Sequence, residues 1–238
     1  MRKTGIIGAM EIEVEGLKKA MEVHRTLKKA KMEFFEGTLC GQEVVVVRSG
    51  VGKVNAAVCT QILADEFAVN LIINTGVAGS LKKEINIEDI VIATDVLHHD
   101  VDATLFGYQI GEVPQMGVLS FPADEEISEL AKEVSEQVNP EIKVFRGRIV
   151  SGDQFIFDKE RKAYIKNTFE AFCTEMEGTA IGHTAWLNGI PFLIIRAISD
   201  KADDSAKIEY PVFEERAAAD SLRLVKGLMK RFSEDQAK

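Results

Sequence analysis

Residues 192–200 have the sequence FLIIRAISD, a strongly apolar run that ends on the carboxylate of Asp200. Residues 4–10 (TGIIGAM) and 71–75 (LIINT) are shorter runs of the same kind. Continuous apolar runs of this length are typical of strands that are buried on both faces of a parallel sheet. The carboxyl ends of such strands meet at one crevice, so the sequence predicts an α/β protein with its site at that edge.

Three acidic residues lie at or just beyond the ends of apolar runs. They are Glu13 after the first run, Glu177 in the segment CTEMEGTAIGH, and Asp200. Charged side chains are rarely buried without a partner or a function. Three carboxylates, with Arg196 close to one of them in sequence, indicate acid–base chemistry on a polar, neutral or cationic group.

The composition limits the class of protein. The chain has 238 residues, 46% of them hydrophobic, and a net charge of −9, which argues against nucleic acid as a partner. No apolar stretch approaches the length of a membrane span, so we expect no membrane partner. Cys40, Cys59 and Cys173 do not have the number or spacing of a disulfide framework or a zinc site. We therefore expect free thiols and a cytoplasmic protein.

Apolar periodicity and turn signals divide the chain into strands and helices that largely alternate. We expect strands at residues 4–10, 33–39, 43–49, 71–75, 89–96, 144–150, 172–175 and 192–198. We expect helices at residues 11–21, 54–67, 125–138, 159–169, 177–187 and 214–232. No linker or repeat interrupts them, so residues 1–238 are predicted to form a single domain. The pattern predicts a three-layer α/β/α sandwich around a mixed, mostly parallel twisted sheet, antiparallel near residues 33–49.

Two glycine-rich turns follow predicted strands, Gly50-Val51-Gly52-Lys53 and Gly76-Val77-Ala78-Gly79. Neither has the spacing of a phosphate-binding loop or a dinucleotide fingerprint. We interpret both as places where the backbone approaches other backbone or a small ligand. The cluster His98-His99-Asp100 with Asp102 has no matching set of distant ligands, so we interpret it as a loop and expect no metal.

Aromatic side chains gather after turns in Phe106-Gly107-Tyr108 and Phe155-Ile156-Phe157, outside any helical period. They either pack in the core or form a wall on which a planar ligand stacks. Glu177 is predicted to begin a helix, whose dipole would keep its carboxylate ionised. An ionised glutamate accepts hydrogen bonds and suits a hydroxyl-rich ligand such as ribose, and a simple helix cap is the alternative.

Eight motifs occur in an order and spacing that resembles one known family. They are Gly8-Ala-Met-Glu-Ile-Glu13, Ser49-Gly-Val-Gly-Lys53, Asn74-Thr-Gly-Val-Ala-Gly79, His99-Asp-Val-Asp102, Phe106-Gly-Tyr108, Ser151-Gly-Asp-Gln-Phe-Ile156, Glu175-Met-Glu177 and Arg196-Ala-Ile-Ser-Asp200. From about residue 4 to about residue 230 the chain resembles bacterial 5′-methylthioadenosine/S-adenosylhomocysteine nucleosidases. The resemblance implies the purine-nucleoside phosphorylase-like fold, a homodimer and no cofactor. It also implies hydrolysis of the N-glycosidic bond of these nucleosides, and of 5′-deoxyadenosine, in methionine salvage.

The resemblance assigns roles to individual residues. Glu13 corresponds to the base that activates water, Asp200 to the acid that protonates N7 of adenine, and Glu177 to the ligand of the ribose hydroxyls. The other residues assigned to the substrate site are Met10, Val51, Val77, Gly79, Phe106, Tyr108, Pro114, Phe155, Ile156, Met176, Arg196 and Tyr210. Among them, Phe155 would stack on adenine, and Tyr108 and Pro114 would come from the partner subunit.

Two positions depart from the usual pattern of the family. Serine often stands where this chain has Val77, and its hydroxyl can orient the acid, so here backbone amides or another group must orient Asp200. Valine also occurs in relatives that cleave 6-amino-6-deoxyfutalosine. Tyr210 stands where the family often has phenylalanine near the alkylthio group. The substrate preference among methylthioadenosine, S-adenosylhomocysteine, 5′-deoxyadenosine and aminofutalosine therefore stays open.

Two other functions compete with hydrolysis. A phosphorylase of the same fold would need a cationic pocket for phosphate, whereas the first strand is followed by Glu11 and Glu13 and the nearby glycine turn offers only Lys53. A binding or sensor module would have no use for Glu13 beside the anomeric carbon. Hydrolysis needs an acid that is protonated near neutral pH and anionic groups beside the sugar, which these carboxylates supply.

Overall fold

The computed structural model describes the backbone of residues 2–202 and 206–236, and the side chains of these residues except 206–212, 214 and 236. Its strands are β1 (Lys3–Gly8), β2 (Glu22–Lys29), β3 (Met32–Leu39), β4 (Gln42–Arg48), β5 (Leu71–Ser80), β6 (Ile90–His98), β7 (Phe121–Pro122), β8 (Val144–Ser151), β9 (Cys173–Glu175) and β10 (Phe192–Asp200). Its helices are α1 (Glu11–Ala20), α2 (Lys53–Phe67), the 3₁₀ turn η1 (Thr104–Phe106), α3 (Glu125–Val138), α4 (Lys159–Phe169), α5 (Gly178–Leu187) and α6 (Ala206–Gln236).

The strands form one mixed sheet in the order β10-β6-β8-β9-β5-β1-β4-β3-β2, with β7 paired to β6. The parallel pairs are β1–β4, β1–β5, β5–β10, β6–β8 and β8–β9. The antiparallel pairs are β2–β3, β3–β4, β5–β9, β6–β7 and β6–β10. Antiparallel pairing therefore extends well beyond the section predicted near residues 33–49. Because β10 pairs with both β5 and β6, strands β5, β9, β8, β6 and β10 close into a ring.

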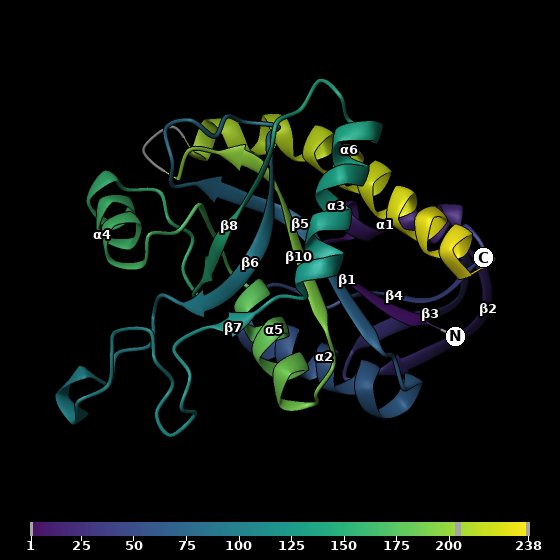
Figure 1. The fold of residues 1–238 in the computed structure, drawn as a ribbon, viewed down its shortest axis with the longest axis horizontal. Coiled ribbons are helices and arrows are strands. Elements are labelled where there is room, and N and C mark those ends of the chain that lie inside the picture. Colours follow the sequence, from purple (N-terminus) through teal and green to yellow (C-terminus); the bar gives the residue numbers. More distant parts are fainter. Residues whose placement is uncertain (1, 203–205, 237–238) are drawn as a thin grey trace.

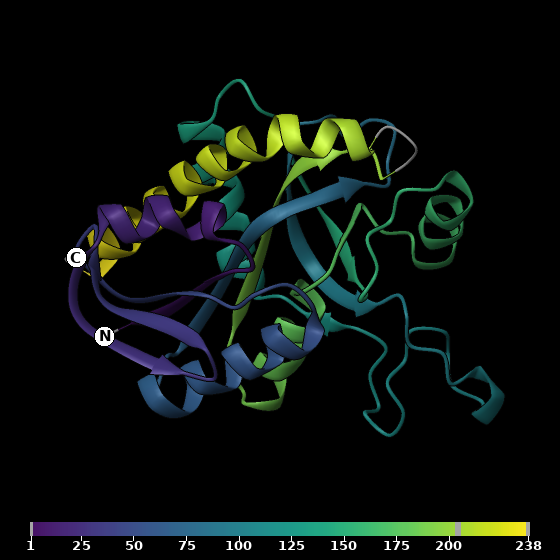
Figure 2. The ribbon, with the colours of Figure 1, turned by 180° about the vertical axis from the view of Figure 1, so that it is seen from behind.

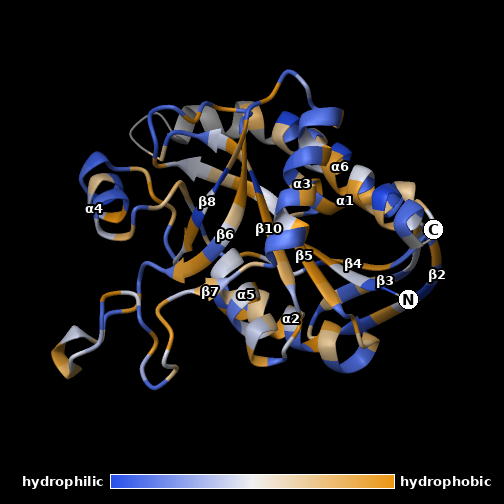
Figure 3. Ribbon diagram, viewed as in Figure 1, coloured by the Kyte–Doolittle hydropathy of each residue, from blue (hydrophilic) through white to orange (hydrophobic). Residues whose placement is uncertain are grey.

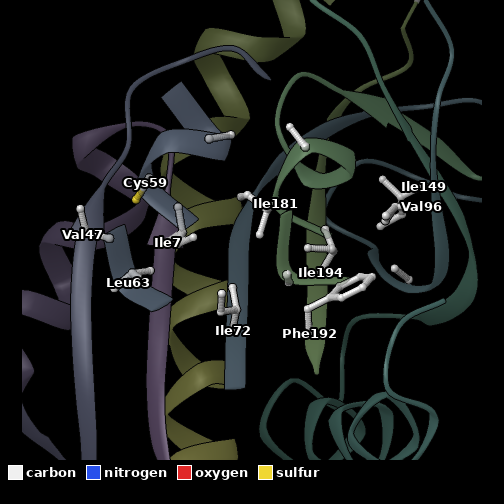
Figure 4. Close-up of a cluster of buried hydrophobic side chains, with 14 of the residues drawn as sticks. Ile7, Val47, Cys59, Leu63, Ile72, Val96, Ile149, Ile181, Phe192 and Ile194 are labelled. Carbon is white, nitrogen blue, oxygen red and sulfur yellow. The ribbon is translucent and has the colours of Figure 1, made fainter. Parts of the chain in front are cut away.

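Helices cover both faces of the sheet, which confirms the predicted α/β/α fold (Figures 1 and 2). Helices α1, α3 and α6 lie on one face, and α2 and α5 pack together on the other. The central strands are mostly apolar, whereas helix α3 alternates between polar and apolar residues (Figure 3). One of the two large buried clusters fills the layer under α2 and α5, with Ile7, Ile72, Ile181 and Ile194 among its residues (Figure 4). The other fills the layer under α1, α3 and α6.

The short elements β7 and η1 were not predicted, and three longer elements also differ from the sequence-based expectation. β2 was not predicted, because it is an exposed edge strand with the sequence EVHRTLKK and has no buried apolar alternation to mark it. Helix α6 begins at Ala206, eight residues before the predicted start. β5 continues through Gly76–Gly79, where a tight turn was expected, because this segment pairs with β10 as far as Asp200.

Candidate active site

The ends of β1, β5, β9 and β10 surround a cavity of about 270 Å³. Among the predicted site residues, its lining contains Met10, Glu13, Val51, Val77, Gly79, Phe155, Met176, Glu177 and Asp200. Its other lining residues are Ala9, Ala78, Thr174, Glu175 and Ser199. Segments that are far apart in sequence thus place the three carboxylates in one cavity, as strand ends at the crevice of an α/β sheet are expected to do.

Glu13 lies in the first turn of α1, and its carboxylate is bound by backbone amides from two elements. Oε2 accepts hydrogen bonds from the N–H groups of Ala9 (2.6 Å) and Met10 (2.9 Å), and Oε1 accepts one from Val77 (3.2 Å). Burial raises the pKa of Glu13 above its ordinary value, against the opposing effect of these amides and of Arg196. A buried carboxylate held in a fixed orientation, with its pKa moved toward neutrality, is suited to remove a proton from water.

Glycines in β5 allow both reacting carboxylates to approach the backbone. A Cβ atom at Gly76 would lie 2.7 Å from Oε1 of Glu13, and one at Gly79 would lie 2.8 Å from Oδ1 of Asp200. Both distances are shorter than non-bonded contacts permit, so any side chain there would displace the acid. Glycine at these two positions therefore lets the carboxylates of Glu13 and Asp200 lie directly against the backbone of β5.

Asp200 is oriented by two groups next to it in the chain. The Ser199 hydroxyl donates to Oδ2 (2.9 Å), and the backbone N–H of Ala202 donates to Oδ1 (2.7 Å). Ala202 adopts a positive φ of 49°, which turns its amide back toward the carboxylate. Val77 has no hydroxyl that could orient the Asp200 carboxylate. One backbone amide and the Ser199 hydroxyl orient it instead.

Arg196 was predicted to bind substrate, but it lies behind the cavity wall. The side chain is fully buried and is absent from the cavity lining. Its Nη2 contacts Oε2 of Glu175 at 2.5 Å, its Nε donates to the same oxygen at 3.2 Å, and its Nη2 also donates to Asn74. Its Nη1 donates to the Ile195 carbonyl oxygen at 2.8 Å, so every nitrogen of the guanidinium has a partner within the protein.

Glu177 also differs from the prediction, because the start of α5 does not keep it ionised. Burial, the negative charge of Glu175 and, to a smaller extent, that of Glu13 raise its pKa to about 8, although Gly52 and Arg196 oppose the shift. Oε1 of Glu177 accepts a hydrogen bond from the Gly52 N–H at 2.7 Å. The amides at the start of α5 bind Glu175 instead, and burial beside that anion favours the neutral form of Glu177, which faces the cavity.

Glu177→Gln is expected to stabilise the fold at alkaline pH. The unfolded chain releases the Glu177 proton near its ordinary pKa, whereas the folded chain retains it up to about pH 8. The free energy of unfolding therefore falls as pH rises between these values, and glutamine removes this loss. Thermal unfolding should show the variant melting a few degrees above the wild type at pH 8.5, with a smaller difference at pH 5, at roughly 2–4 °C per kcal/mol. An equal difference at both pH values would contradict the raised pKa.

Four more of the predicted site residues, Phe106, Tyr108, Pro114 and Ile156, are absent from the cavity lining. Ile156 is buried in a separate cluster beside α4, next to Phe155 in sequence. Phe106, Tyr108 and Pro114 lie on the segment between β6 and β7, which projects from the body of the molecule (Figures 1 and 2). The side chain of Tyr210 lies outside the described residues.

Sequence reasoning did not assign two of the groups that hold the site. Glu175 and Ser199 occur in the sequence analysis only as members of two of the eight motifs, with no role of their own. Their positions in the sequence could have indicated both. Glu175 lies two residues before Glu177, and Ser199 lies directly before Asp200. Within the described residues, no group of three histidine, cysteine or acidic side chains is arranged to hold a metal ion. None of the helices in the described ranges combines the length and apolarity that crossing a membrane requires.

Comparison with known proteins agrees with this arrangement. The profile of the phosphorylase superfamily matches residues 3–230. A 5′-methylthioadenosine/S-adenosylhomocysteine nucleosidase from Exiguobacterium is 41% identical over 233 residues, which cover 98% of this chain and 99% of the relative. The chain belongs to the 5′-methylthioadenosine/S-adenosylhomocysteine nucleosidase family of the phosphorylase superfamily. The predicted family is thereby confirmed.

Solved structures of this nucleosidase family share the fold over almost the whole chain. The Neisseria meningitidis nucleosidase in complex with methylthio-immucillin-A has a TM-score of 0.93 and 41% identity, covering 97% of this chain and 100% of that one. A futalosine hydrolase of Helicobacter pylori is also similar, with a TM-score of 0.91 and 32% identity over 97% of this chain and 98% of that one. The similarity thus includes a protein named for the alternative substrate class.

Proposed function

We propose that this chain hydrolyses the N-glycosidic bond of 5′-methylthioadenosine, S-adenosylhomocysteine and 5′-deoxyadenosine, releasing adenine. The observation that carries the proposal is that Glu13, Glu177 and Asp200 line one cavity, each of them held by at least one backbone amide. Such fixed acids are the groups that glycosidic hydrolysis requires. The family relationship and the complex of the Neisseria meningitidis enzyme with methylthio-immucillin-A support the same substrate class.

In the proposed reaction, the bond between the ribose C1′ and adenine N9 breaks as Asp200 transfers its proton to N7. Positive charge then develops on the ribose, and the carboxylates around the cavity stabilise it. Glu13 removes a proton from water as the water oxygen forms a bond to C1′. The products are adenine and the 5′-substituted ribose, and the proton from water later restores Asp200 through solvent. Glu177 binds the ribose hydroxyls and becomes ionised as they donate to it.

Water is favoured over phosphate as the nucleophile. No lysine or arginine is among the described residues that line the cavity. Arg196, the buried cation behind the wall, is already paired with Glu175. A phosphate dianion would therefore meet carboxylates without the cationic partners that phosphate sites use.

The apolar part of the cavity favours a thioether substituent. Met10, Val51, Phe155 and Met176 lie on its wall, so adenine, the sugar and an alkylthio group can all find apolar contacts. The similarity to a futalosine hydrolase supports 6-amino-6-deoxyfutalosine as the second candidate substrate. The test is the release of the purine base by the purified chain from each of the four nucleosides. Cleavage of methylthioadenosine with the highest kcat/KM is expected, and no cleavage of any of them would refute the proposal.

We further propose that the active species is a homodimer in which each subunit completes the other's site. The segment between β6 and β7 projects from the molecule, and its Leu105 and Phe106 are 89% and 79% exposed. Val54 on α2 and Leu187 on α5 add further exposed apolar side chains. Exposed apolar surface of this extent usually marks an interface, and the family resemblance assigns Tyr108 and Pro114 to the partner's pocket.

Mixing two defective variants tests this arrangement. Tyr108→Ala should raise KM for methylthioadenosine about tenfold, the effect of about 1.4 kcal/mol of lost contact, while light scattering still reports a dimer. Glu13→Gln lacks the proposed base in its own cavity but keeps an unchanged segment between β6 and β7. A heterodimer of the two contains one site with a normal cavity and a normal segment, so mixing should restore activity with the wild-type KM. A monomer with full activity, or no recovery on mixing, would refute the exchange of segments.

A cytoplasmic location is part of the proposal as well. Cys40, Cys59 and Cys173 are all free thiols. Burial raises the pKa of Cys59 and of Cys173, so both are chemically inert in the fold. Free, unpaired cysteines are usual in reducing compartments, which supports this location.

A further inference from the structure

Glu175 lines the cavity, yet its carboxylate is occupied by the protein itself. Oε2 receives two contacts from the Arg196 guanidinium and accepts hydrogen bonds from the N–H groups of Glu177 (2.9 Å) and Gly178 (2.7 Å). Oε1 accepts a hydrogen bond from the Ser151 hydroxyl. The partners of both oxygens thus come from the protein, and Oε2 in particular is fully occupied by donors.

The contacts of Glu175 join four elements around the cavity. Arg196 comes from β10, Ser151 from β8, and the two amides from the start of α5, while Glu175 itself ends β9. Ser151 is in turn fixed by Thr179, whose N–H donates to the Ser151 oxygen at 2.6 Å. A Cβ atom at Gly178 would lie 3.1 Å from Oε1 of Glu175 and 3.3 Å from Nη2 of Arg196, so the helix packs tightly against the ion pair.

The charge of Glu175 also acts on the groups that face the substrate. Arg196, Ser151 and the amides outweigh burial and hold the pKa of Glu175 below its ordinary value, so it is an anion. The charged or titratable groups that act on Glu177 are Glu175 on β9, Arg196 on β10 and Glu13 on α1. A fixed anion two residues away favours the neutral form of Glu177 in the cavity.

We propose that Glu175 is a positioning residue, whose carboxylate fixes Arg196 and the first turn of α5 and places a fixed negative charge beside Glu177. Nucleoside binding then converts Glu177 into an anion when the ribose hydroxyls donate to it, and the binding step releases a proton. Only the expected effect of Glu175 on kcat/KM rests on the proposed function. The effect of its charge on Glu177 exists in the substrate-free protein and can be measured there.

Glu175→Gln distinguishes the effect of the negative charge at this position from the effect of the side chain's size. Glutamine keeps the length of the side chain and removes its charge, so the pKa of Glu177 should fall from about 8 toward its ordinary value. Carbon-13 NMR of protein labelled at the glutamate carboxyls would follow this titration without substrate, with the Glu177 signal identified by its loss in Glu177→Gln. The kcat/KM for methylthioadenosine should fall about 100-fold, as expected when a catalytic group moves by about 1 Å.

Glu175→Asp is the matched control, because it keeps the charge and withdraws the oxygens by one methylene group. It should reduce kcat/KM and leave the titration of Glu177 near that of the wild type. If Glu177 titrates near pH 8 in a folded Glu175→Gln variant, or if that variant has wild-type kcat/KM and pH profile, the inference is wrong. If the wild type cleaves no nucleoside, the proposed function fails, and the NMR titration still decides the charge relation.

Discussion

Asp200→Asn is expected to reduce kcat for methylthioadenosine by at least the 10²–10⁴ that general acid catalysis usually contributes. Asparagine has almost the same shape, and its single amide oxygen can still accept the hydrogen bond from the Ala202 N–H, while its NH₂ group replaces the oxygen that accepts from the Ser199 hydroxyl. It can donate a hydrogen bond to N7 but cannot transfer a proton, so adenine must leave as a poorer leaving group. Binding of the substrate, measured by calorimetry, should remain within about tenfold of the wild type.

Ser199→Ala is the control for Asp200→Asn, because it removes an orienting hydroxyl and keeps the acid. It should cost far less activity, since Ala202 still holds Oδ1. A substrate whose leaving group needs no proton should be cleaved by Asp200→Asn at nearly the wild-type rate. If Asp200→Asn retains activity on methylthioadenosine within about tenfold of the wild type, departure of the base needs no acid here.

Glu13→Gln is expected to abolish turnover while substrate still binds. Glutamine cannot accept the proton that attacking water must lose, so the reaction stops at formation of the bond to C1′. The amide also places an NH₂ group where the wild type has an acceptor facing Ala9, Met10 or Val77, which weakens the fixed orientation. Single-turnover assays with excess enzyme should show no adenine over many wild-type half-times.

The two variants should differ on an activated substrate. Glu13→Gln should remain inactive even when the leaving group needs no proton, because water still lacks its base. Asp200→Asn should regain activity on the same compound. Turnover by Glu13→Gln close to that of the wild type would remove Glu13 from the mechanism.

The layered fold and the position of the site can be predicted from the sequence. The strands that carry the site are continuous apolar runs such as residues 4–10, 71–75 and 192–198, which are short and rich in isoleucine, as buried strands of a sheet are. The acids that follow two of these runs then share one edge of the sheet. β2 could not be found in this way, because an exposed edge strand carries no apolar pattern.

The division of roles between Glu175 and Glu177 could not be predicted from the sequence. The two acids lie two residues apart in one short segment, Thr174-Glu175-Met176-Glu177, just before the start of α5. What separates them is Arg196, which reaches Glu175 from another strand and makes it an anion, leaving Glu177 facing the cavity. The contact that favours the anionic form of Glu175 joins two strands that are far apart in sequence. The residues around Glu175 and Glu177 in the sequence therefore do not predict it.

The central claim is that water, activated by Glu13, is the nucleophile, and product analysis in phosphate-free buffer tests it most directly. The purified chain is incubated with 5′-methylthioadenosine, and adenine and the sugar product are measured before and after phosphate is added. We predict equal amounts of adenine and 5-methylthioribose without phosphate, at a rate that phosphate does not increase. Release of adenine only with phosphate present, together with 5-methylthioribose 1-phosphate as the product, would contradict the claim.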